Sequence, residues 1–191
     1  MVEDCYKRII EDPDQPSSVY MQVAADFYSR EDWWRGADIL AELLNRFPDD
    51  PKVKKNSAAI RLRLGNCLLR SGRADQALKA FEALKNEAIS TATLEGLAEC
   101  YVQTRSFEKA LQTYIELRRG CEVGGPQWWQ AQYNIANTLM LLGRTEECGR
   151  LIGQQKALRP KMGGPQMRAK FESLLHTCGE LSSEKGTKNI P

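Results

Sequence analysis

Residues 64–84, LGNCLLRSGRADQALKAFEAL, return 33 residues later as LAECYVQTRSFEKALQTYIEL at 97–117. Each copy has a small residue after a leucine (Gly65 in the first copy) and an aromatic residue further along (Phe81). Self-similarity at a period of this length is the signature of helical repeats, in which one pair of helices cannot bury its apolar face alone. The stretch therefore predicts stacked helix hairpins.

Two further copies extend the pattern. One follows 38 residues later, and an earlier one lies 40 residues upstream of the first. With a spacing of 40, the earlier copy consists of Ala24-Ala25, Tyr28, Ala37, Ala41 and Leu44. A small residue on each first helix is expected to admit the second helix, and the four copies supply Ala25, Gly65, Ala98 and Ala136.

These residues resemble the tetratricopeptide repeat, whose signature is a large residue, Leu, Gly and Tyr, followed by Ala, an aromatic residue and Pro. The resemblance covers roughly residues 18–160 and implies an all-α fold, a right-handed superhelix of antiparallel helix hairpins. We expect one domain over residues 1–178, with a capping helix at 165–178 and a flexible tail at 179–191. Its four repeats are expected at 18–50, 51–89, 90–123 and 126–160.

Glycine and proline mark the expected helix ends. Gly72 and Gly143 can take the left-handed conformation that ends a first helix, and Arg105 stands at the same place in the third copy. The tetrapeptide Gly-Gly-Pro-Gln occurs twice, so Pro126 and Pro165 are each expected to open a helix.

Near the start, Cys5, Ile9 and Pro13 are spaced like the second helix of a repeat that lacks its first. This favours further repeats N-terminal to the chain. A natural N-terminal capping helix is the alternative.

Composition narrows the function classes. The net charge is +2, with 27 basic and 25 acidic residues, so the chain lacks the basic excess of a nucleic-acid-binding domain. No stretch has the roughly 20 apolar residues of a membrane span, and the acidic start does not resemble a signal peptide. We expect a cytoplasmic protein without a membrane segment that does not bind nucleic acid.

Catalytic and metal-binding patterns were not found. The six cysteines are widely spaced, and Cys67, Cys100 and Cys148 fall at buried repeat positions. His176 is the only histidine, and the double glycines lack the Lys-Ser/Thr of a phosphate loop. We therefore expect no enzymatic activity, no cofactor and no metal.

The resemblance implies a concave groove lined by the first helices, in which Asn side chains grip the backbone of an extended peptide. The expected groove residues are Arg63, Asn66, Arg70, Glu95, Glu99, Tyr133, Asn134 and Asn137. The chain is accordingly expected to be a non-catalytic scaffold that binds a protein or peptide. An accessory segment of a larger enzyme and an RNA-binding array are the alternatives.

Two features bear on the partner. Residues 51–74 contain seven basic residues and no acidic one, which indicates either an acidic partner or pairing with acidic neighbours in the chain. Two tryptophan pairs, Trp33-Trp34 and Trp128-Trp129, begin expected helices and serve either packing or partner binding. Because adjacent residues face about 100° apart on a helix, the members of a pair should differ in burial.

Overall fold

The computed structural model describes residues 6, 9, 12, 14–87 and 89–187. These residues form helices and no strand, and residue contacts divide the chain into two compact units, residues 1–100 and 101–191. The helices are α2 (Ser17–Ser29), α3 (Trp33–Arg46), α4 (Pro51–Lys55), α5 (Ser57–Arg70), α6 (Ala74–Glu87), α7 (Thr91–Gln103), α8 (Phe107–Arg119), α9 (Pro126–Leu141), α10 (Thr145–Leu158) and α11 (Pro165–Thr187).

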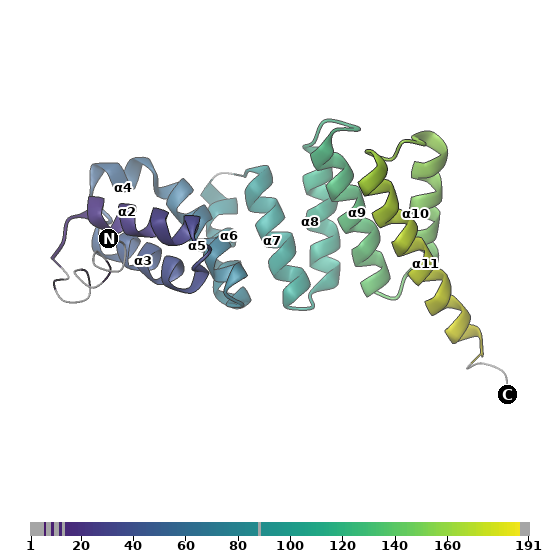
Figure 1. Cartoon of the computed structure of the whole chain (residues 1–191), viewed down its shortest axis with the longest axis horizontal. Coiled ribbons are helices and arrows are strands. Elements are labelled where there is room, and N and C mark those ends of the chain that lie inside the picture. Colours follow the sequence, from purple (N-terminus) through teal and green to yellow (C-terminus); the bar gives the residue numbers. More distant parts are fainter. Residues whose placement is uncertain (1–5, 7–8, 10–11, 13, 88, 188–191) are drawn as a thin grey trace. The chain divides into compact units, whose positions relative to one another are not determined.

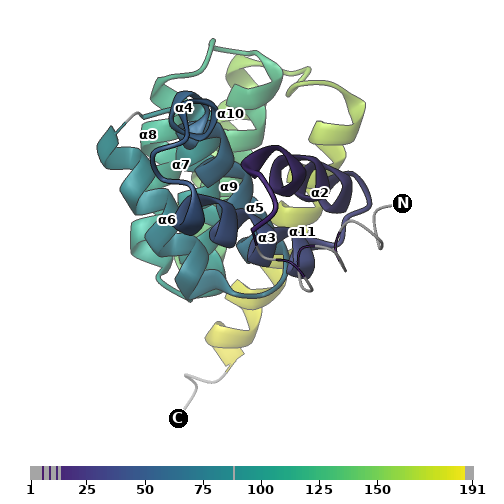
Figure 2. The same ribbon diagram turned by 90° about the vertical axis from the view of Figure 1, so that its left-hand side faces the viewer.

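The first unit is built from helix hairpins. Short connections join α2 to α3 and α5 to α6, and the two helices of each pair pack against each other. Helix α3 also packs against α5, so each hairpin covers a face of the next (Figure 1 and Figure 2). The all-α fold of stacked hairpins expected from the repeat is confirmed.

Helix α3 illustrates why these segments are helical. The Asp32 side chain caps it by accepting a hydrogen bond from the Arg35 backbone N–H at 3.2 Å. Its buried residues follow the helical period, with Gly36, Ile39 and Leu43 on one face. Burying that face against α2 and α5 stabilises the helix, because an isolated helix of this length is marginal in water.

The predicted spacing of 40 between the first two copies is wrong by one residue. Burial identifies the core positions of the first copy as Ala24, Leu40 and Leu43, whereas Ala25, Ala41 and Leu44 are exposed or only half-buried. Ala37 is buried as expected. A spacing of 41 aligns Ala24 with Gly65. The helix that begins at Pro51 ends at Lys55, and Asn56 separates it from α5, so the connection contains a separate short helix that the sequence comparison missed.

The turns within the four hairpins share one conformation. Gly72 has φ 80° and Gly143 has φ 73°, which confirms the predicted left-handed residues. Arg105, with φ 58°, takes the same conformation without being a glycine, as does Glu31 with φ 59°. Beyond each left-handed residue the chain folds back on the helix, and the Arg73 N–H donates to the Leu68 carbonyl at 2.8 Å.

Two glycines in the first unit hold one aromatic ring. A Cβ added to Gly65 on α5 would lie 2.7 Å from the ring of Phe81, and one added to Gly96 on α7 would lie 2.3 Å from it. Phe81 on α6 is completely buried. The ring therefore lies directly against the backbones of both helices, and any larger residue at either glycine would displace it.

The second unit follows the same principle. Helix α9 packs against α8 and α10, and α11 packs against both α9 and α10. The buried face of α11 contains Phe171, Leu174 and Cys178, whereas Glu172 and Leu175 between them are exposed. Pro126 and Pro165 open α9 and α11, as predicted. The predicted end of the last helix at residue 178 is wrong, because α11 continues to Thr187; residues 188–191 lie outside the described part.

The expectation about tryptophan pairs is confirmed for one pair and wrong for the other. Trp34 is 57% exposed and Trp33 is half-buried. Trp128 and Trp129 are both buried, because Trp129 packs against Phe171 and the Arg159 guanidinium covers the Trp128 ring at 5.1 Å. Near the N-terminus, Ile9 is buried, while Cys5 and Pro13, the other two residues of the predicted helix, lie outside the described residues.

The Phe81 contact predicts opposite effects for two Gly-to-Ala substitutions. Gly96→Ala should lower the free energy of unfolding by about 1–3 kcal/mol, because the added methyl group overpacks the Phe81 site. Gly153, in the middle of α10, has no neighbour within 4 Å of an added Cβ. Gly153→Ala should therefore stabilise the protein by about 0.5–1 kcal/mol through helix propensity alone. Urea unfolding measures both; a Gly96→Ala protein as stable as the parent would contradict the close contact.

The buried cysteines predict slow reaction with thiol reagents. Cys67, Cys100 and Cys148 are all fully buried, as expected from their repeat positions. Burial raises the pKa of Cys67 to about 11 and that of Cys100 to about 12, so almost no thiolate forms at pH 8. In a Cys5→Ser, Cys121→Ser protein, the four remaining thiols should react with a disulfide reagent only on unfolding. Rapid labelling of Cys67 in native buffer would contradict the packing described.

Candidate functional site

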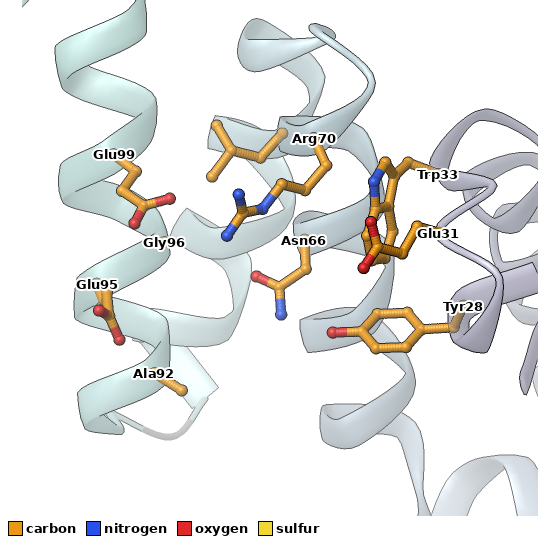
Figure 3. A pocket seen from close by; sticks show the side chains of 10 residues that line it. Tyr28, Glu31, Trp33, Asn66, Arg70, Ala92, Glu95, Gly96 and Glu99 are labelled. Atoms are coloured by element: carbon orange, nitrogen blue, oxygen red, sulfur yellow. The ribbon is translucent and has the colours of Figure 1, made fainter.

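The first unit contains a polar pocket of about 480 Å³ that extends across four helices and the α2–α3 turn. Helix α5 supplies Asn66 and its own last residue, Arg70, and Figure 3 shows these two side chains between the other two walls. The remaining lining residues are Tyr28, Glu31 and Trp33 from the α2–α3 hairpin, Leu69 from α5, and Ala92, Glu95, Gly96 and Glu99 from α7. The volume is in the range of about 300–1,000 Å³ typical of ligand sites.

Four of the predicted groove residues meet in this pocket, namely Asn66, Arg70, Glu95 and Glu99. The Phe81 contact explains their placement. Asn66 follows Gly65 in α5, and Glu95 precedes Gly96 in α7. The two glycines that hold the Phe81 ring thus lie beside residues that line the pocket.

Arg63 lies next to the pocket but does not line it. Its guanidinium carbon is 5.9 Å from the centre of the Tyr28 ring, a distance typical of a cation–π contact. Tyr28 in turn meets Trp33 edge to face, with ring centres 5.3 Å apart. The protein thus already places one arginine against the aromatic wall of the site.

The other three predicted groove residues lie on α9 in the second unit. Tyr133 packs against Phe171 of α11, with ring centres 5.6 Å apart, and Lys170 lies 5.7 Å from its ring. The Asn134 side chain accepts a hydrogen bond from Gln130 at 3.0 Å. Asn137 is half-buried. Tyr133 is therefore a packing residue between α9 and α11, and Asn134 is held within its own helix.

Sequence reasoning missed the wall formed by Tyr28 and Glu31. The misplaced register of the first copy is the reason, since Tyr28 aligns with the pocket residue Leu69 only at a spacing of 41. Trp33 was noted as an aromatic residue open to partner binding, but its place beside α5 was not foreseen. The left-handed φ of Glu31 marks the turn that carries it into the pocket.

The charges of the pocket are uncompensated. Within the part of the chain that the structure describes, none of its three carboxylates forms an ion pair within 4.0 Å, and Arg70 forms none either. Burial raises the pKa of Glu99, the neighbouring Glu95 raises it further, and Arg70 lowers it in part. The ionised form of Glu99 is therefore disfavoured in the folded protein relative to an exposed glutamate.

The basic residues of 51–74 are distributed over several contacts. Arg73 donates to Asp38 at 2.8 Å and to the Trp34 carbonyl at 3.0 Å, and its guanidinium covers the Trp34 ring at 4.1 Å. Lys54 pairs with Asp49 at 2.9 Å. Of the seven, only Arg70 lines the pocket. The contacts of Arg73 and Lys54 favour the reading in which this segment neutralises acidic neighbours.

The described residues lack the arrangements that a metal site or a membrane span requires. No group of three or more His, Cys, Asp or Glu side chains is arranged there to hold a metal ion. The described helices include none that is long and apolar enough to cross a membrane. His176 is exposed and lies 3.5 Å from Glu180 of its own helix.

Comparison with known proteins agrees with the fold. A tetratricopeptide-repeat family model matches residues 59–88. No curated protein matches the chain in sequence. Among solved structures, TPR-like repeats of a protein of Podosopora anserina described as a kinesin light chain share 14% identity at a TM-score of 0.71, with 91% of each chain covered.

Two other solved structures show the same likeness. A tetratricopeptide repeat protein from Parabacteroides merdae shares 18% identity at a TM-score of 0.62, covering 89% of this chain and 67% of that one. The apo form of RapI shares 14% identity at a TM-score of 0.66, covering 96% and 76%. At these identities the likeness concerns the fold alone. The repeated residues, the stacked hairpins and these matches together show that the chain has a tetratricopeptide-like helical-repeat fold, with a tetratricopeptide repeat matched at residues 59–88.

Proposed function

We propose that this protein is a non-catalytic interaction scaffold that holds an extended segment of a partner protein in the pocket across α2, α5 and α7. The observation that carries the proposal is the polar pocket itself, whose charged side chains have no ion-pair partner within the described residues. An accessory role in a larger enzyme would use the same pocket and stays a prediction.

The side chain of Asn66 supports a peptide as the ligand. The Asn66 amide forms no hydrogen bond with another described residue, and it lies in the middle of the site (Figure 3). An asparagine amide offers both a donor and an acceptor, which is what a peptide unit requires. A partner strand that passes Asn66 would meet carboxylates on both sides.

Filling the pocket should abolish partner binding whatever the chemistry of the partner. Ala92 is exposed and lines the pocket, so Ala92→Trp should block it while changing stability by only about 0.5 kcal/mol. Partners captured by the parent protein and identified by mass spectrometry should bind Ala92→Trp at least tenfold more weakly in calorimetry. Asn66→Ala, which removes the side-chain amide, should also weaken partner binding.

Ala83→Trp is the matched control, because Ala83 is also exposed, lies on α6 and does not line the pocket. It should bind the same partner as the parent does. If Ala92→Trp folds and binds with unchanged affinity, the partner site lies elsewhere and the proposal is wrong.

A further inference from the structure

The pocket carries an excess of negative charge. Glu31, Glu95 and Glu99 line it, and Arg70 is the single basic residue among its lining side chains. Glu31 comes from the α2–α3 turn and the other two from α7, so the carboxylates lie on opposite walls (Figure 3). A ligand between the walls would therefore meet negative charge from both sides. This distribution opposes an acidic segment and favours a cation.

The aromatic wall is an independent indication of the same ligand class. Tyr28 and Trp33 present their rings to the pocket, and aromatic faces attract cations, most effectively guanidinium groups and ammonium groups that have lost water. The contact of Arg63 with the Tyr28 ring shows that this surface accepts a guanidinium. Neither observation depends on the count of carboxylates.

Arginine fits the combined site better than lysine. A planar guanidinium can stack on an aromatic ring and at the same time donate paired hydrogen bonds to a carboxylate, whereas an ammonium group is a compact, strongly hydrated charge. The volume of about 480 Å³ leaves room for peptide backbone beside the side chain, within reach of Asn66.

We propose that the pocket receives an arginine side chain of the partner's extended segment, an inference that rests on the groove binding proposed above. The guanidinium lies between the aromatic wall and the carboxylates of α7, and the peptide backbone passes Asn66. The positive charge of Arg70 repels the bound guanidinium and therefore lowers the affinity of the pocket for it. Because burial and Glu95 raise the pKa of Glu99, a cation entering the pocket also relieves an unfavourable charge.

Substitution of Arg70 separates this inference from binding of an acidic partner. The probe is an immobilised library of N-acetylated hexapeptides in which one position is varied. The parent protein should retain arginine peptides at least tenfold better than those with leucine or glutamate, with lysine in between. Arg70→Ala should retain arginine peptides more strongly, because the opposing charge is gone. If acidic peptides bound in the groove, the same substitution would weaken retention.

Charge reversal provides the second test. A Glu95→Lys, Glu99→Lys protein should lose arginine peptides at least tenfold and gain glutamate peptides. Glu122→Lys with Glu146→Lys makes the same change in net charge at two exposed residues outside the pocket and should leave the preference unchanged. Circular dichroism confirms that each variant is folded.

Each contrary result identifies which proposal fails. Enrichment of acidic peptides that Ala92→Trp abolishes would overturn the arginine inference and leave groove binding intact. Arginine retention that survives Ala92→Trp, or falls equally in the control pair, would place binding outside the pocket and overturn both. A library without any enriched peptide would also overturn both.

Discussion

The contact on which the first unit depends is that of the Phe81 ring with Gly65 and Gly96. Because neither glycine has a side chain, the ring lies against the backbones of α5 and α7 at distances that a methyl group would make impossible. Close packing of this kind leaves little freedom for the two helices to shift. The residues beside the glycines, Asn66 and Glu95, are thereby held at the pocket. One apolar contact in the core thus positions polar groups at the surface.

Much of this arrangement could be predicted from the sequence. The 33-residue period aligns the second and third copies without an insertion, and four of the expected groove residues on α5 and α7 line one pocket, with Arg63 beside it. The first copy was misaligned because α4 and Asn56 occupy the connection before α5, and a shift of one residue turns a helical position by about 100°. Tyr28 and Glu31 were missed for that reason.

The charge of the site illustrates a second limit of sequence reasoning. The seven basic residues of 51–74 form a run in the chain, but folding points them at different neighbours, with Arg73 at Asp38 and Lys54 at Asp49. The carboxylates that face Arg70 come from the α2–α3 turn and from α7, far from it in sequence. The linear run of charge left open an acidic partner or pairing with acidic neighbours, whereas the charges that line the folded pocket favour a cationic ligand.

The central claim is that this pocket binds an arginine side chain, and nuclear magnetic resonance tests it most directly. N-acetylarginine amide would be titrated into isotope-labelled protein, with N-acetylglutamate amide as the control ligand. If the pocket binds arginine, the arginine compound should shift the resonances of the Trp33 indole N–H, the Asn66 side-chain amide and the Gly96 backbone amide, three residues that line the pocket. The glutamate compound should leave these resonances unchanged. Shifts confined to other residues, or equal shifts with both compounds, would contradict this claim.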